Sequence, residues 1–106
     1  MPRFLFLTSY NAEGTKGLLK DGGSKRRKVA EDIAKAMGGR LEAFYFAFGE
    51  FDACAIIEAP DAASAAAVSL AVNASGAVTN KTVVLMTPEE MDAATKKAPA
   101  YRRPGK

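Results

Sequence analysis

Two consecutive apolar runs in the middle of the chain, Leu41–Phe48 and Phe51–Glu58, constrain its fold more than any other feature. Only a Gly-Glu pair separates them, and glycine at the first central position is typical of a type II′ hairpin turn. Such a turn predicts an antiparallel hairpin in which Tyr45 pairs with Cys54. The chain therefore contains a β-sheet with an apolar hairpin.

Neither face of this predicted hairpin is polar enough to meet water. One face carries phenylalanines, alanines and Ile57, and its large rings suit the space beneath alanine-rich helices. Because monomers rarely expose apolar patches beyond a few hundred Å², we expect the opposite face to pack against the sheet of another copy. A fold-back of the last helix or of the tail over that face is the alternative. The opposite face consists of Leu41, Ala43, Tyr45, Ala47, Asp52, Cys54, Ile56 and Glu58.

The segment before the hairpin predicts a strand and a helix. Arg3–Tyr10 has the composition of a strand, and the residues from Asn11 to Gly17 are rich in turn formers. A helix then begins at an N-cap Ser24 and ends at Gly38–Gly39, where glycine permits a left-handed cap. The inward stripe of this helix is Val29, Ile33 and Met37.

The segment after the hairpin repeats the pattern and adds a helix. Asp61 caps an alanine-rich helix, Ala77–Thr87 is the fourth strand, and Pro88 begins a last helix that ends near Lys97. Ala67, Leu70, Ala71 and Ala74 lie on one side of the alanine-rich helix. The order βαββαβ predicts an α+β domain of ferredoxin-like topology, with a four-stranded antiparallel sheet and helices on one face. We expect one domain over residues 1–97 and a basic tail over 98–106.

The composition removes the commonest catalytic chemistries. The chain has no histidine, which is the usual general base near neutral pH and the usual nitrogen ligand of zinc. A single cysteine, Cys54, cannot form an internal disulfide and favours a reducing compartment. No apolar stretch is long enough for a membrane span. We therefore expect a cytoplasmic protein that binds no metal and no cofactor.

The net charge of +3 resides in the C-terminal tail. The last eleven residues hold five basic residues and no acid, which leaves 10 basic and 12 acidic residues in the other 95. Within that body, Lys25–Lys28 is the dense basic run, and four consecutive basic residues are typical of a solvated helix face. Because no aromatic residues alternate with them to stack on bases, the sequence argues against nucleic-acid binding.

Four residues are candidates for ligand binding: Tyr10, Tyr45, Asp52 and Lys81. A carboxylate on an apolar sheet face is costly unless it is paired, so Asp52 either accepts hydrogen bonds near the turn, pairs with a base such as Lys81, or acts in binding or acid–base chemistry. The two tyrosines either line a pocket with Asp52 or pack in the core or an interface.

The turn segment LEAFYFAFGEFD contains Gly49, Phe51 and Asp52, and the segments LTSYNAEGTKGLLKDGG and SLAVNASGAVTNKTVVLMTPEEM lie on either side of it. With these segments in this order, the chain resembles the GYD family of small bacterial and archaeal proteins, named for a Gly/Tyr/Asp motif. Phe51 stands where the motif has tyrosine. A packing role of the aromatic ring can therefore apply to this chain, whereas a role of the tyrosine hydroxyl cannot. The resemblance implies a ferredoxin-like domain in a dimeric α/β-barrel assembly, without an established activity.

Two functional hypotheses follow. The favoured one is a homo-oligomeric module that binds a small ligand or regulates a partner and lacks the usual catalytic residues. The alternative is a cofactor-poor enzyme, monooxygenase-like or isomerase-like by analogy of fold, in which Asp52 or a tyrosine is the acid or base.

Overall fold

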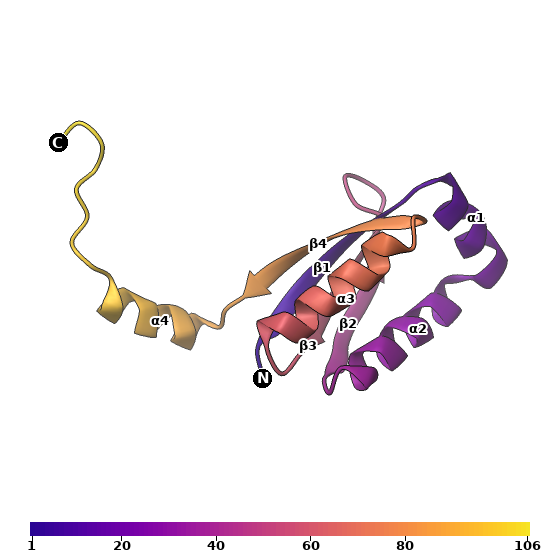
Figure 1. Cartoon of the computed structure of the whole chain (residues 1–106), viewed down its shortest axis with the longest axis horizontal. Helices are drawn as coiled ribbons and strands as arrows, with labels where there is room; N and C mark the ends of the chain where they lie inside the picture. Colours follow the sequence, from indigo (N-terminus) through magenta and orange to yellow (C-terminus); the bar gives the residue numbers. More distant parts are fainter.

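The computed structural model describes residues 1–106 and contains the predicted four-stranded sheet. The strands follow the order β2-β3-β1-β4, and every neighbouring pair is antiparallel. Helices α2 and α3 lie side by side on one face of this sheet (Figure 1), so the chain is an α+β protein consistent with the ferredoxin-like fold. The elements are β1 (Arg3–Tyr10), α1 (Ala12–Asp21), α2 (Gly23–Ala36), β2 (Arg40–Phe46), β3 (Ala53–Glu58), α3 (Ala62–Ala74), β4 (Val78–Leu85) and α4 (Pro88–Lys97). Each of the four helices is too short or too polar to cross a bilayer.

The hydrophobic core lies between the sheet and these two helices. Alternate residues of β1 and β3 point toward the helices. This agrees with the prediction that the hairpin face with phenylalanines and alanines packs beneath the helices. Burying one such Phe or Ile side chain contributes roughly 1.5–3 kcal/mol. The buried cluster consists of Phe4, Phe6, Ala55 and Ile57 from the sheet, Ala34 from α2, Ala59 from the β3–α3 loop, and Ala65 and Val68 from α3.

The connection between β2 and β3 is wider than the predicted two-residue turn. The register is confirmed, because Tyr45 pairs with Cys54. The type II′ turn is wrong, because Gly49 does not adopt the positive φ that this turn requires, and Phe48 is fully exposed instead of paired. The backbone N–H of Asp52 donates to the Thr8 carbonyl of β1 at 2.9 Å, which draws the end of the loop toward β1.

A β-bulge moves one residue of the predicted open face into the core. The pairing shifts between Leu41, which lies opposite Ile57, and Ala43, which lies opposite Ile56. The extra residue, Glu42, reverses the alternation of side chains. Leu41 therefore packs against the core instead of the open face.

Helix α1 occupies the segment that was predicted to be a loop. Asn11 is its N-cap and accepts a hydrogen bond from the Gly14 N–H at 3.0 Å. The two glycines of this segment lower its helix propensity and hide the cap signal. The next helix begins earlier than predicted, with Gly22 in place of Ser24 as its N-cap.

The other predicted helix ends are confirmed. Gly38 follows α2 with φ of 79°, the left-handed conformation that favours glycine. Asp61 accepts from the Ser64 N–H at 2.8 Å and caps α3. Thr87 and Glu90 form a reciprocal capping box at the start of α4, in which each side chain accepts from the backbone N–H of the other.

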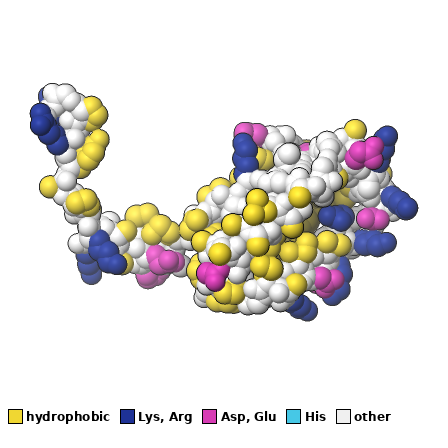
Figure 2. Space-filling view, viewed as in Figure 1, with side chains coloured by type: hydrophobic (Ala, Val, Ile, Leu, Met, Phe, Trp, Pro, Cys, Tyr) yellow, Lys and Arg dark blue, Asp and Glu magenta, His cyan; other side chains and the backbone are white.

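The apolar side of α3 that the sequence indicates does not face the sheet. Ala65 and Val68 are buried, whereas Leu70 is 70% exposed and Ala67, Ala71 and Ala74 are exposed as well. A helix that is apolar all round has no periodicity to show which side is buried. Its outer surface carries hydrophobic side chains toward solvent (Figure 2).

Helix α4 and the tail extend away from the body as an arm (Figure 1). No residue of α4 is buried. The radius of gyration is 16.7 Å, compared with about 13 Å for a compact chain of 100 residues. The division into a domain over 1–97 and a tail over 98–106 stays a prediction.

Candidate functional site

A cavity of about 80 Å³ lies between α2, α3 and the sheet. It exists because β3 presents only alanines, Ala53 and Ala55, at two successive inward positions, and because each helix packs on its own part of the sheet. Twelve of its fifteen lining residues are hydrophobic, and a mostly apolar lining with a few polar groups is typical of small-molecule sites. The apolar walls include Phe6 from β1, Val29 and Ile33 from α2, and Val68 and Val72 from α3.

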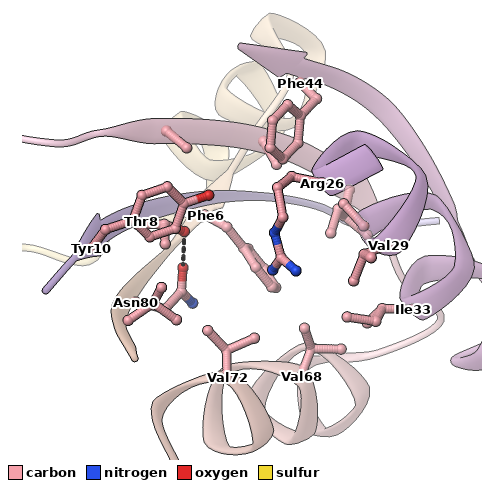
Figure 3. Close-up of a pocket in the computed structure, with 15 residues that line it drawn as sticks. Phe6, Thr8, Tyr10, Arg26, Val29, Ile33, Phe44, Val68, Val72 and Asn80 are labelled. Carbon is pink, nitrogen blue, oxygen red and sulfur yellow. Dashed lines mark hydrogen bonds between the residues drawn. The ribbon is translucent and has the colours of Figure 1, made fainter. Parts of the chain in front are cut away.

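Arg26 extends its guanidinium into this cavity (Figure 3). The other basic residues of the Lys25–Lys28 run pair with acids one helical turn away, at 3.1–4.0 Å. Arg26 has Gly22 and Ala30 at those spacings, so no acid on its own helix lies within reach. It forms no ion pair or side-chain hydrogen bond within the chain.

The uncharged polar groups of the cavity lie on one side of it (Figure 3). The Thr8 hydroxyl donates to Oδ1 of Asn80 at 3.1 Å, and Nδ2 of Asn80 donates to the hydroxyls of Ser69 and Thr82. Asn80 is only 8% exposed, and these bonds satisfy its amide as burial requires. Tyr10 lines the same side, and its hydroxyl has no hydrogen-bond partner within the chain.

Asp52 lies beside the cavity and accepts a hydrogen bond from the backbone. Its carboxylate accepts a hydrogen bond from the Tyr10 N–H at 2.8 Å, and both residues line a neighbouring hollow formed with Leu18 of α1 and Phe46 of β2. Asp52 therefore sits on the helix-covered side, not on the open face as predicted. The contact with a backbone amide is one of the roles that the sequence left open.

The open face of the sheet contains an apolar row flanked by two mixed rows. Residues directly opposite each other in antiparallel strands point to the same side, so the pairing defines these rows. They are Arg40, Glu58, Arg3 and Leu85 in the first, Ala43, Ile56, Leu5 and Val83 in the second, and Tyr45, Cys54, Leu7 and Lys81 in the third. Tyr45 is 69% exposed, and the free thiol of Cys54 is partly exposed.

The first row is held by a network of ion pairs. Glu58 meets Arg40 at 2.8 Å and Arg3 at 3.1 Å, and Arg3 also meets Glu42 at 2.8 Å. The hydrogen bond from Arg40, with the charges of Arg40 and Arg3, lowers the pKa of Glu58 below its ordinary value of 4.5 against an opposing effect of desolvation. The hydrogen bond and charge of Glu42 raise the pKa of Arg3.

Comparison with known proteins places this geometry in a family. The family model described as GYD domain matches residues 4–95. The chain belongs to the GYD domain family. A curated relative from Thermus thermophilus is named "Glutamine synthetase and cystathionine beta-lyase binding protein"; it is 29% identical over 83 residues, which cover 78% of this chain and 86% of the relative. No solved structure matches.

The motif residues of this GYD domain lie at the end of the hairpin. Gly49 is exposed in the loop, and the ring of Phe51 lies under the Lys81 ammonium at 5.9 Å, a cation–π contact. Asp52 holds the Tyr10 backbone. In this chain the motif residues thus bridge the loop to β1 and β4.

The GYD fold separates the four predicted ligand-binding residues into two pairs. Tyr10 and Asp52 lie together on the helix-covered side, whereas Tyr45 and Lys81 lie in one row of the open face. The sequence reasoning missed Arg26, which it treated as part of a solvated run. The signal that could have found it is the absence of an acid four residues away on either side.

Proposed function

We propose that this GYD protein is a non-catalytic binding module that assembles with a second copy through the open face of its sheet and holds a small ligand in the cavity on the other side. The observation that carries the proposal is the second row of that face, in which Ala43, Ile56, Leu5 and Val83 form an uninterrupted apolar line across all four strands. Apolar area left in water costs about 25 cal/mol per Å².

A second copy fits this face better than a fold-back of the chain's own arm. Helix α4 extends away from the sheet instead of covering it (Figure 1). Met91 of this helix and Met86 of the connection that precedes it are half exposed. In a two-fold dimer the arm of each copy would reach the other copy. A single two-fold interface would then bury the open faces and the arms of both copies.

The charged first row supports a defined orientation of the dimer. Arg40, Glu58 and Arg3 of this row, with Glu42 of the bulge, form a continuous chain of ion pairs at one end of the open face. Because their charges already balance, this end adds little attraction and is suited to the rim of an interface. The apolar second row and Tyr45 in the third row would form its centre.

The relative's name supports binding as the mode of action. It describes a protein that binds two enzymes, so we extend the proposal to a regulatory role exerted through protein surfaces. The alternative of a cofactor-poor enzyme draws no support from Asp52, since its carboxylate is engaged by the Tyr10 backbone.

Sedimentation equilibrium of the full chain over a range of concentrations tests the assembly. We expect the wild type to have about twice the monomer mass of 11.2 kDa. Ile56→Lys, at the centre of the apolar row, and Tyr45→Lys, at an exposed position that folding does not require, should each shift the mass to that of the monomer.

Leu19→Lys is the matched control, because Leu19 is an exposed apolar residue of α1 outside the open face. It should leave the mass unchanged, and circular dichroism should show the same helix and strand content for all variants. A wild type that remains monomeric at hundreds of micromolar, or a dimer that survives both open-face variants, would contradict the proposed assembly.

A further inference from the structure

We infer that the cavity ligand is a small monocarboxylate with a short apolar group, recognised by Arg26. This inference rests on the proposed binding function and names the ligand class. Its starting point is an unpaired guanidinium among mostly apolar walls. Arg26 is partly buried, and a charge that is partly withdrawn from water without a partner is costly. An anion in the cavity would reduce that cost.

The position of Arg26 in the helix explains why it reaches the cavity. Arg26, Val29, Ala30 and Ile33 lie at spacings of three and four and therefore share one side of α2, the side that lines the cavity. Its neighbour Lys25 lies outside this stripe, faces the solvent and pairs with an acid of α1. The arginine is thus placed on the core-facing stripe among aliphatic residues.

The charge of the cavity favours a monoanion. Arg26 is the one cationic side chain among the lining residues, so a phosphate dianion would be only half neutralised. The planar guanidinium fork matches the two oxygens of a carboxylate. The Tyr10 hydroxyl, which has no partner within the chain, provides a further donor on the opposite side of the cavity (Figure 3).

The size and the walls define the rest of the ligand. A cavity of about 80 Å³ accommodates only a few non-hydrogen atoms. Apart from Arg26, Thr8 and Asn80, the lining residues are hydrophobic, with Val68 and Val72 on α3 and Val29 and Ile33 on α2. A carboxylic acid of three or four carbons, such as the branched isobutyrate, therefore matches both the volume and the polarity.

The experiment uses isobutyrate as the probe and isobutyramide as its neutral isostere, with chemical shifts of the ¹⁵N-labelled full chain as the readout. We expect isobutyrate to shift the signals of residues around the cavity at millimolar concentrations. Isobutyramide and inorganic phosphate should bind at least about tenfold more weakly, as expected for the loss of a charged hydrogen bond.

Arg26→Gln should weaken isobutyrate binding at least about tenfold and remove the preference over isobutyramide. Arg27→Gln is the matched control, because Arg27 is exposed and pairs with Glu31, and it should bind as the wild type does. Val72→Phe places a larger side chain in the cavity from α3 and leaves Arg26 of α2 unchanged, and it should abolish binding. Thermal unfolding checks that each variant folds.

The outcomes distinguish the inferred class of ligand from the presence of any ligand in the cavity. If isobutyramide binds as well as isobutyrate, or if Arg26→Gln binds like the wild type, the inference is overturned while a ligand in the cavity stands. If neither probe binds and a library of small neutral and anionic compounds also fails to shift the cavity signals, both the inference and the ligand part of the proposed function are overturned.

Discussion

The carboxylate of Asp52 accepts a hydrogen bond from the backbone N–H of Tyr10 at 2.8 Å. This contact joins the end of the hairpin to the end of β1, 42 residues earlier in the chain. It satisfies an amide at the last residue of the strand, next to the position where α1 is capped by Asn11. The motif aspartate therefore closes the sheet end that lies beside the cavity.

Asp52→Ala should lower the free energy of unfolding by about 1–3 kcal/mol, since it leaves the partly buried Tyr10 N–H without an acceptor. Asp52→Asn keeps an acceptor and should cost about 1 kcal/mol or less. Urea denaturation measures both. Glu50→Ala, at an exposed position of the same loop, is the control and should stay within about 0.5 kcal/mol of the wild type. Equal stability of Asp52→Ala and Glu50→Ala would refute the structural role.

The Glu58 ion pairs should make stability depend on pH. The pKa of Glu58 is lowered in the folded chain by Arg40 and Arg3, so its contribution is present above the ordinary carboxyl pKa of about 4.5 and is lost as the pH falls through the folded value. The difference in unfolding free energy between the wild type and Glu58→Gln should therefore shrink toward acid pH. Urea denaturation between about pH 7 and pH 3 measures it.

Glu89→Gln controls for the change in net charge, because Glu89 is exposed and outside the ion pairs. A difference for Glu58→Gln that stays constant across this pH range, or that grows on acidification, would show that the network does not lower the pKa of Glu58.

Two glycines of α1 should respond in opposite directions to the same substitution. A Cβ at Gly14 would overlap the backbone carbonyl of Ala77 and crowd Tyr10, whereas a Cβ at Gly17 meets nothing. Gly14→Ala should lower the melting temperature, because backbone must shift to admit the methyl group. Gly17→Ala should raise stability by roughly 0.5–1 kcal/mol, the helix preference for alanine over glycine. Parallel changes in the two variants would contradict this packing of α1 on the start of β4.

Helix α4 should be protected only in the assembly. It has ten residues and no buried side chain, and isolated helices of this length are marginal in water even when capped. Amide hydrogen exchange should be fast for residues 88–97 in the monomeric Ile56→Lys variant and slower in the wild type. The exchange of β1 residues, at the centre of the sheet, provides the internal control. Equal exchange of α4 in both proteins would show that the arm is not part of the interface.

The sequence by itself determined the elements whose signals are local. The strand Arg3–Tyr10 followed from its composition, and the register of Tyr45 with Cys54 followed from the position of the connection between the two apolar runs. The cap at Asp61, the start of α4 at Pro88 and the end of α2 at Gly38 followed from side-chain or backbone chemistry within a few residues. With these elements in order, the α+β topology needed no further information.

Only the tertiary structure decided which side of an ambiguous element faces the core. The bulge at Glu42 turned Leu41 inward, and the alanine-rich helix α3 placed Val68 and not Leu70 against the sheet. No local sequence pattern indicates either choice. The cavity likewise arises from three elements that converge, with alanines of β3 as its floor. Arg26 looked like one of four solvated charges, and it became the candidate recognition residue only because the packing of α2 directs its side chain into that cavity.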